Sequence, residues 1–220
     1  MPLRKLYEGF LAFQQQSFMP KRAFFEQLAV RQRPKIMMVA CSDSRVDPAI
    51  LTNCDPGELF MVRNVANLVP PCALDAGAHG TSAALEFAVI SLEVEHIIVL
   101  GHSGCGGIQA LMTADPALDR EHTFIHNWMH ITDEARRRTL LVARQLPLKE
   151  QLRILEQEAI KTSLANLLSF PWINERVESG QLRIHGWRFD LNEGNMYVFV
   201  PQADRFEPLN LDLAAIMQAQ

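Results

Sequence analysis

The sequence contains no uninterrupted apolar run approaching the about 20 residues that span a bilayer, so we expect no membrane association. It also contains no dominant basic block, since 21 lysines and arginines stand against 25 acidic residues and give a net charge of −4. The short run 136–138 of three arginines is typical of the solvent-facing side of a helix. We therefore expect no nucleic-acid binding.

Cysteine is scarce, with four residues among 220: Cys41, Cys54, Cys72 and Cys105. The first ten residues have neither the apolar core nor the small-residue cleavage site of a signal peptide. Disulfide frameworks belong mainly to secreted chains, so we expect a cytoplasmic, reducing location. Cysteines in that location more often serve metal binding or catalysis.

The sequence has no internal repeat, low-complexity tract or linker, and we expect a single domain over residues 1–220. Hydrophobic residues make up 48% and charged residues 21%, as in ordinary globular proteins. Within the domain, residues 1–33 form a distinct segment, because apolar side chains recur there at helical spacing from Leu3 to Phe13. We expect two amphipathic helices in this N-terminal arm, packed on the partner in a dimer.

Short continuous apolar runs at 35–40, 58–63 and 96–100 are typical of strands buried on both faces. A helix is expected over 81–92, between the second and third runs. Strands that alternate with helices predict an α/β fold with a mostly parallel sheet.

The second half is predicted to be mainly helical and to end in two strands joined by turn residues. We expect four to five strands in the sheet, flanked by helices, with the last two strands antiparallel at one edge. The expected helices are about 122–145, 149–169 and 171–179, and the expected strands are 182–189 and 196–200.

Two loops carry residues suited to metal chemistry. Residues 41–45 read Cys-Ser-Asp-Ser-Arg directly after the first strand, and residues 101–107 read Gly-His-Ser-Gly-Cys-Gly-Gly directly after the third. Ligands of open α/β sheets bind at the carboxyl ends of the strands, so the two loops are expected to meet. Cys41, His102 and Cys105 then offer two thiolates and an imidazole. That set suits tetrahedral zinc and leaves a fourth position open, as in catalytic sites.

Asp43 is a candidate fourth ligand that would close this site. Arg45 lies two residues further on and could hold the Asp43 carboxylate away from the metal as a bidentate pair. A carboxylate held in this way could also orient a water molecule on the zinc. We therefore expect Asp43 and Arg45 to act together as a catalytic dyad.

The two loops together resemble the β-class carbonic anhydrases, as do residues 60–71 and the later His185-Gly186-Trp187. The N-terminal pattern resembles bacterial members, including those that accompany cyanate degradation. The resemblance implies a zinc lyase that interconverts CO2 and bicarbonate through a zinc-bound hydroxide. It implies one zinc per chain on the three ligands named above, and a homodimer or a tetramer.

The resemblance also implies a substrate pocket shared between two subunits. Gln32, Phe60 and Phe87 would line it from the partner, while Val65 and the backbone of Gly106 would line it from the same subunit. Many members carry tyrosine where Phe87 stands, so a hydroxyl group is missing here.

The family has a closed subtype, in which the aspartate binds zinc and a tryptophan precedes the cysteine motif. Residues 38–40 read Met-Val-Ala, which resembles the open subtype.

Three alternatives use the same residues. The first is a hydrolase of CS2 or COS on the same fold, which would differ in the access route to zinc. The second is a zinc-thiolate sensor, although no second cysteine lies close to Cys105 in sequence. The third is a cysteine nucleophile at Cys41 activated by Arg45, which would leave His102 and Cys105 without a role.

Overall fold

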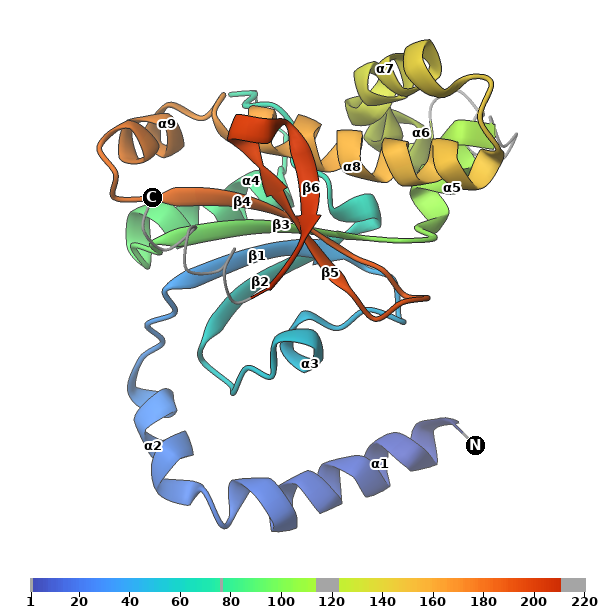
Figure 1. Cartoon of the computed structure of the whole chain (residues 1–220). Coiled ribbons are helices and arrows are strands. Elements are labelled where there is room, and N and C mark those ends of the chain that lie inside the picture. Colours follow the sequence, from blue (N-terminus) through green and yellow to red (C-terminus); the bar gives the residue numbers. More distant parts are fainter. Residues whose placement is uncertain (1, 76, 114–122, 211–220) are drawn as a thin grey trace.

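A computed structural model describes residues 2–75, 77–113 and 123–210. These residues build a sheet with the strand order β2-β1-β3-β4-β5-β6 (Figure 1). The first four strands of that order are parallel, and β5 and β6 are antiparallel to their neighbours. The strands are β1 (Ile36–Cys41), β2 (Leu59–Asn64), β3 (His96–His102), β4 (Arg183–Phe189), β5 (Met196–Val200) and β6 (Arg205–Pro208).

The α/β class and the mostly parallel sheet are confirmed, but the predicted count of four to five strands is too low for the described residues. β4 and β5 are antiparallel as expected, but this pair does not form the edge of the sheet, because β6 pairs with the outer side of β5. β6 was missed because its sequence, Arg-Phe-Glu-Pro, is short and half charged. Its contact with the sheet includes Phe206, whose ring lies 5.4 Å from that of Phe199.

Helices cover both faces of the sheet, with α4, α8 and α9 on one face and α3 on the other (Figure 1). The expected helix 122–145 is divided by a 3-10 turn, and residue 122 lies outside the described residues. Within the described ranges, no helix has the length and apolarity needed to cross a bilayer. The helical segments of the body are α3 (Pro48–Thr52), η2 (Val65–Asn67), α4 (Gly80–Glu86), η3 (Phe87–Ser91), α5 (Gly106–Thr113), α6 (Phe124–Met129), η4 (His130–Thr132), α7 (Asp133–Ala143), α8 (Leu148–Leu167), α9 (Pro171–Glu178) and η5 (Pro201–Ala203).

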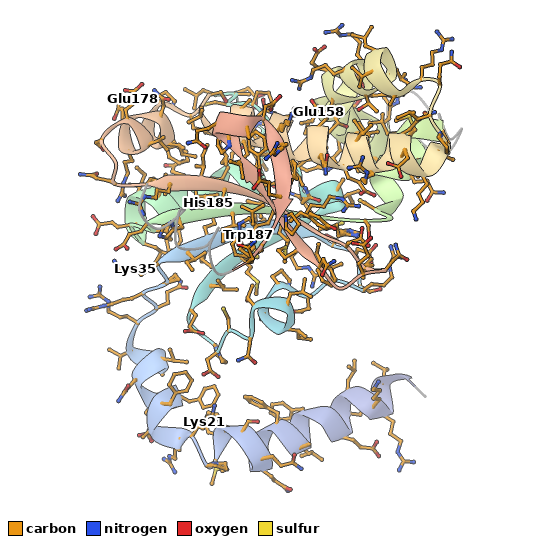
Figure 2. The ribbon with its side chains drawn as sticks, in the orientation of Figure 1. Lys21, Lys35, Glu158, Glu178, His185 and Trp187 are labelled. Atoms are coloured by element: carbon orange, nitrogen blue, oxygen red, sulfur yellow. The ribbon has the colours of Figure 1, made fainter. Side chains whose placement is uncertain are left out.

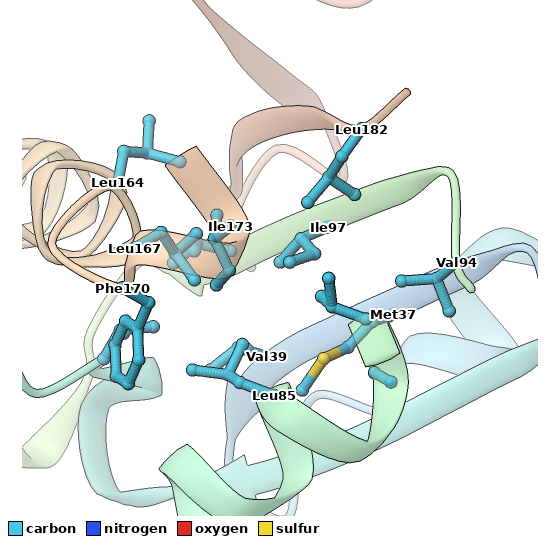
Figure 3. Close-up of a cluster of buried hydrophobic side chains, with 14 of the residues drawn as sticks. Met37, Val39, Leu85, Val94, Ile97, Leu164, Leu167, Phe170, Ile173 and Leu182 are labelled. Carbon is cyan, nitrogen blue, oxygen red and sulfur yellow. The ribbon is translucent and has the colours of Figure 1, made fainter. Parts of the chain in front are cut away.

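The continuous apolar runs of β1 and β3 are explained by burial on both sides of the sheet, but the expectation is wrong for β2, which lies at the edge and is only partly buried. In β1, Met37 and Val39 face the main core, while Met38 and Ala40 face a smaller cluster on the other side. Figure 3 shows the main core, in which sheet residues meet Leu85 of α4 and residues of α8 and α9.

The N-terminal arm consists of α1 (Pro2–Phe13), the π-helical η1 (Gln14–Phe18) and α2 (Arg22–Val30). It extends away from the sheet, as Figure 1 and the position of Lys21 in Figure 2 show. Its two expected helices are confirmed. Apolar side chains of α1 are nevertheless exposed, with Leu6 and Phe10 at 66% and 62%.

The two motif loops lie at the carboxyl ends of β1 and β3, and α8 packs closely on the neighbouring strands β3 and β4. A Cβ atom placed on either Gly101 or Gly186 would lie 2.8 Å from a side-chain carbon of Ile160. Only glycine therefore lets α8 approach the strands this closely.

Candidate metal centre

Three candidate ligands converge at the carboxyl ends of β1 and β3. Cys41 ends β1, His102 ends β3 and Cys105 directly precedes α5. Ala40 pairs with Leu100, so the two strands end at nearly the same level. The ligand atoms of the three residues lie within 4.8 Å of one another, and all three residues are buried. Among the described residues, this is the group of His, Cys, Asp and Glu side chains placed to hold a metal ion.

The sulfur positions fit zinc. The two Sγ atoms are 3.9 Å apart. Tetrahedral zinc with Zn–S bonds of about 2.3 Å separates two sulfurs by about 3.8 Å. The cysteines could therefore hold the ion with little rearrangement.

The imidazole of His102 is held with one nitrogen available to a metal. Its Nδ1 lies 3.0 Å from the carbonyl oxygen of Ser103, to which it donates as N–H. This bond leaves the lone pair on Nε2. Nε2 is buried and has no hydrogen-bond partner among the described residues. A buried nitrogen without a partner is unfavourable, and a metal ion would satisfy it.

The thiol groups of Cys41 and Cys105 are hydrogen-bonded to each other, with their Sγ atoms 3.9 Å apart. The hydrogen bond from Cys105 lowers the pKa of Cys41 to about 4, against the opposing effect of burial. The same bond and burial raise the pKa of Cys105. Zinc binds cysteine as the thiolate, so a cation that binds both sulfurs must displace any proton that they hold.

Arg45 holds Asp43 beside the three candidate ligands. The Arg45 backbone N–H and Nε donate to Oδ1 of Asp43, both at 2.9 Å, and Nη2 donates to Oδ2 at 2.6 Å. These bonds hold the pKa of Asp43 well below its usual range. Oδ2 lies 3.8 Å from Nε2 of His102, so Asp43 is close enough to compete for a metal but is bound to Arg45. The expected pair is thus present, and its role in catalysis stays a prediction.

Sequence reasoning missed Arg63, which braces the first loop. Its Nε donates to the carbonyl oxygen of Cys41 at 2.9 Å, and its Nη2 donates to those of Asp43 and Val46, both at 2.7 Å. The sequence did offer one signal, because Arg63 is a charged residue near the end of the largely apolar strand β2, which lies beside β1.

Glu156 of α8 and Arg188 of β4, which brace the second loop, were also missed. Glu156 accepts the backbone N–H of Gly104 at 2.8 Å on Oε1. Arg188 donates to Oε2 through Nε at 2.9 Å and Nη2 at 2.8 Å. Burial raises the pKa of Glu156, and Arg188 opposes that effect. No sequence signal separates Glu156 from the other glutamates of this helix.

The expected pocket residues divide into two groups. Val65 and Gly106 flank Ala66 and Cys105, which belong to the buried cluster around the ligands. Phe60 lies four residues before Asn64, the partner of Cys41, and thus about 13 Å back along the strand.

The ring of Phe60 lies 5.8 Å from that of Phe87, and Gln32 is exposed beyond the end of α2. Within one chain, then, these three residues are not gathered around the ligands.

Comparisons with known proteins agree with this site. A family model described as carbonic anhydrase matches residues 36–196. The Arabidopsis thaliana proteins β-carbonic anhydrase 6 (mitochondrial) and 5 (chloroplastic) are 42% and 45% identical over 191 and 179 residues, which cover 87% and 81% of this chain. The chain spans 65% and 58% of their lengths. A carbonic anhydrase of Synechocystis is 36% identical over 197 residues, covering 90% of this chain and 71% of the relative.

Solved structures give the same result. The β-carbonic anhydrase CcaA matches with a TM-score of 0.88 and 34% identity, over 94% of this chain and 92% of that one. A match to tetrameric β-carbonic anhydrases of Sordaria macrospora has a TM-score of 0.77 and 27% identity, over 95% and 97%. Sequence, fold and the buried Cys-His-Cys group thus agree, and the chain belongs to the β-carbonic anhydrase family.

Proposed function

We propose that this protein catalyses the reversible, zinc-dependent hydration of CO2 to bicarbonate and a proton. The observation that carries the proposal is the buried group of Cys41, His102 and Cys105, with the Asp43–Arg45 pair beside it. Zinc on this group supplies Lewis acidity, which lets water ionise near neutral pH. Three protein ligands leave one position for substrate chemistry.

The side chains around the ligands have separate roles in this proposal. Arg45 keeps Asp43 ionised and away from the ligands, which supports the open subtype. The Asp43 carboxylate then accepts a hydrogen bond from the reacting water and directs its lone pair toward CO2. Val65 and the backbone of Gly106 bound the space in which CO2 is held.

The remaining side of that space is proposed to come from a partner subunit, through Gln32 and the apolar side chains of Phe60 and Phe87. This assignment is supported by the distance of Phe60 from Cys41 along the sheet and by the exposure of Phe87. Exposed apolar side chains on α1 support a homodimer, and a tetramer is a further option.

The test is zinc stoichiometry combined with stopped-flow measurement of CO2 hydration. We expect one zinc per chain and hydration that accelerates as pH rises, because water must lose a proton before it attacks. Zinc without CO2 hydration would point to the CS2 or COS hydrolase or to the sensor. A rate independent of pH would contradict the mechanism.

Dimer formation is tested by changing the exposed face of α1. Leu6→Glu with Phe10→Glu is expected to lower the mass measured by sedimentation and to reduce hydration. Lys5→Glu on the same helix is the control and should preserve both. An unchanged mass for the double variant would refute the role of the arm.

The alternatives gain no support from the comparisons. Arg45 donates to Asp43 and Gly104, whereas a Cys41 nucleophile was expected to be activated by Arg45. A zinc-thiolate sensor usually has a second cysteine near the first in sequence, and Cys105 has none. The fold does bring the Sγ atom of Cys41 to 3.9 Å from that of Cys105. A cytoplasmic location remains a proposal, supported by four cysteines that form no disulfide, and cell fractionation would test it.

A further inference from the structure

Gly104 links two charged pairs near the candidate metal ligands, Arg45 with Asp43 and Glu156 with Arg188. Its carbonyl oxygen accepts a hydrogen bond from Nη2 of Arg45 at 2.9 Å. Its backbone N–H donates to Oε1 of Glu156 at 2.8 Å. Gly104 has a φ of +68°, a conformation that glycine adopts readily and other residues rarely do. Contacts to this glycine therefore help decide where its carbonyl points.

The Glu156 side of this link is buried and fully engaged. The side chains of Glu156 and Arg188 are each 4% exposed. Arg188 occupies Oε2 of Glu156 with two donors and reaches Asp190 with its Nη1 at 3.1 Å. Oε1 is left to accept the N–H of Gly104. A carboxylate fixed in this way cannot rotate without leaving a buried charge unpaired.

The Arg45 side is exposed and needs an anchor. The Arg45 side chain is 55% exposed. Among the described residues, the Arg45 guanidinium donates hydrogen bonds to Asp43 and to the carbonyl oxygen of Gly104. A mobile guanidinium would hold Asp43 less firmly, because long exposed side chains lose entropy when they are fixed.

We propose that Glu156, locked by Arg188, is a positioning residue that orients Gly104, so that Gly104 anchors Arg45 and Arg45 keeps Asp43 off the metal. The proposal rests on the metal site of the proposed function but not on CO2 as its substrate. Without Glu156, Asp43 takes the fourth position more often and excludes other ligands.

The test uses Glu156→Gln in the protein loaded with Co2+, whose visible spectrum reports on ligands. A glutamine has a single acceptor oxygen and an NH2 group, so it cannot serve both Gly104 and Arg188. Glu158→Gln is the matched control, since Glu158 lies on the same helix (Figure 2) and pairs with Lys161 and Arg138. The measured quantity is the dissociation constant of azide at one fixed pH.

We expect Glu156→Gln to weaken azide binding by about 10-fold or more, the size of effect that loss of a group orienting a metal site has on metal affinity or activity, and Glu158→Gln to leave it unchanged. Adding Asp43→Ala should restore azide binding, because Asp43 is the competitor. Wild-type azide affinity in Glu156→Gln overturns the proposal. Azide binding that stays weak in the double variant Glu156→Gln with Asp43→Ala also overturns the proposal, since that result indicates a general structural defect.

If Glu156→Gln does not take up metal, Arg188→Lys supplies the same comparison with the charge retained. Its single ammonium cannot bind as the two-donor guanidinium does. We again expect weaker azide binding that Asp43→Ala restores, and the absence of either effect overturns the proposal. A wild-type protein that binds metal and azide but does not hydrate CO2 overturns the proposed function and leaves this coupling in place.

Discussion

Replacement of Gly101 by alanine should destabilise the protein through its contact with α8. The added Cβ would lie 2.8 Å from Cδ1 and 3.0 Å from Cγ1 of Ile160, whereas carbon atoms in contact prefer about 3.5 to 4.0 Å. Ile160 is fully buried, so it has no solvent side into which it can turn. Overpacking of this kind costs about 1–3 kcal/mol of the free energy of unfolding.

A second substitution isolates this contact. Ile160→Val removes Cδ1, the closest atom, and alone should cost about 0.5–1.5 kcal/mol. In the double variant the removed carbon is the one that clashes, so the total cost should fall below the sum of the single costs by about 1 kcal/mol. Cγ1 remains at 3.0 Å, so the relief is expected to be partial.

Denaturant unfolding of the zinc-loaded protein, at one chain concentration, measures these free energies. Gly80→Ala is the control, because a Cβ at Gly80 meets nothing within 4 Å. Single costs that simply add, within about 0.5 kcal/mol, would refute the packing account. Gly101→Ala should also disturb the loop 101–107, since Glu156, which accepts the N–H of Gly104, lies one helical turn from Ile160.

Three further outcomes are expected at the metal site. Cys105→Ser should lose zinc on dialysis, and a variant that retains one zinc per chain would contradict its assignment as a ligand. Asp43→Ala should keep its zinc and lose about 10- to 100-fold in CO2 hydration; a normal rate in stopped flow would refute its catalytic role. The hydrogen bond with Cys41 raises the pKa of Cys105, so zinc must displace a proton and its affinity should rise with pH; calorimetry that finds constant affinity from about pH 6 to 8 would contradict this.

The features predicted correctly from sequence are those encoded in local pattern. Continuous apolar runs identified β1, β2 and β3, and in β1 and β3 the runs reflect burial on both faces of the sheet, whereas β2 is only partly buried. The spacing of His102 and Cys105, together with Cys41 at the end of a neighbouring strand, identified the group that the fold places to hold a metal ion. The expected edge position of the β4–β5 pair was wrong, because β6, which forms that edge beside β5, is too short and too polar in sequence to be recognised as a strand.

The residues that were missed act through contacts between segments distant in sequence. Arg63 donates to, and Glu156 accepts from, main-chain atoms of the loops, and Arg188 acts indirectly by pairing with the Glu156 carboxylate. No local periodicity marks them, and their charges resemble ordinary surface charges until the fold buries them. Two of the three belong to segments outside the motif loops and residues 60–71.

The ligands end two neighbouring central strands, which bears on the lifetime of the folded chain. Cys41 and His102 are the last residues of β1 and β3, so these strands cannot separate at this end while both side chains hold one ion. Release of zinc would then precede unfolding, and the half-life of the native state would follow the rate of metal loss, a kinetic rather than an equilibrium property. In that case, adding a chelator would determine the rate at which the protein denatures.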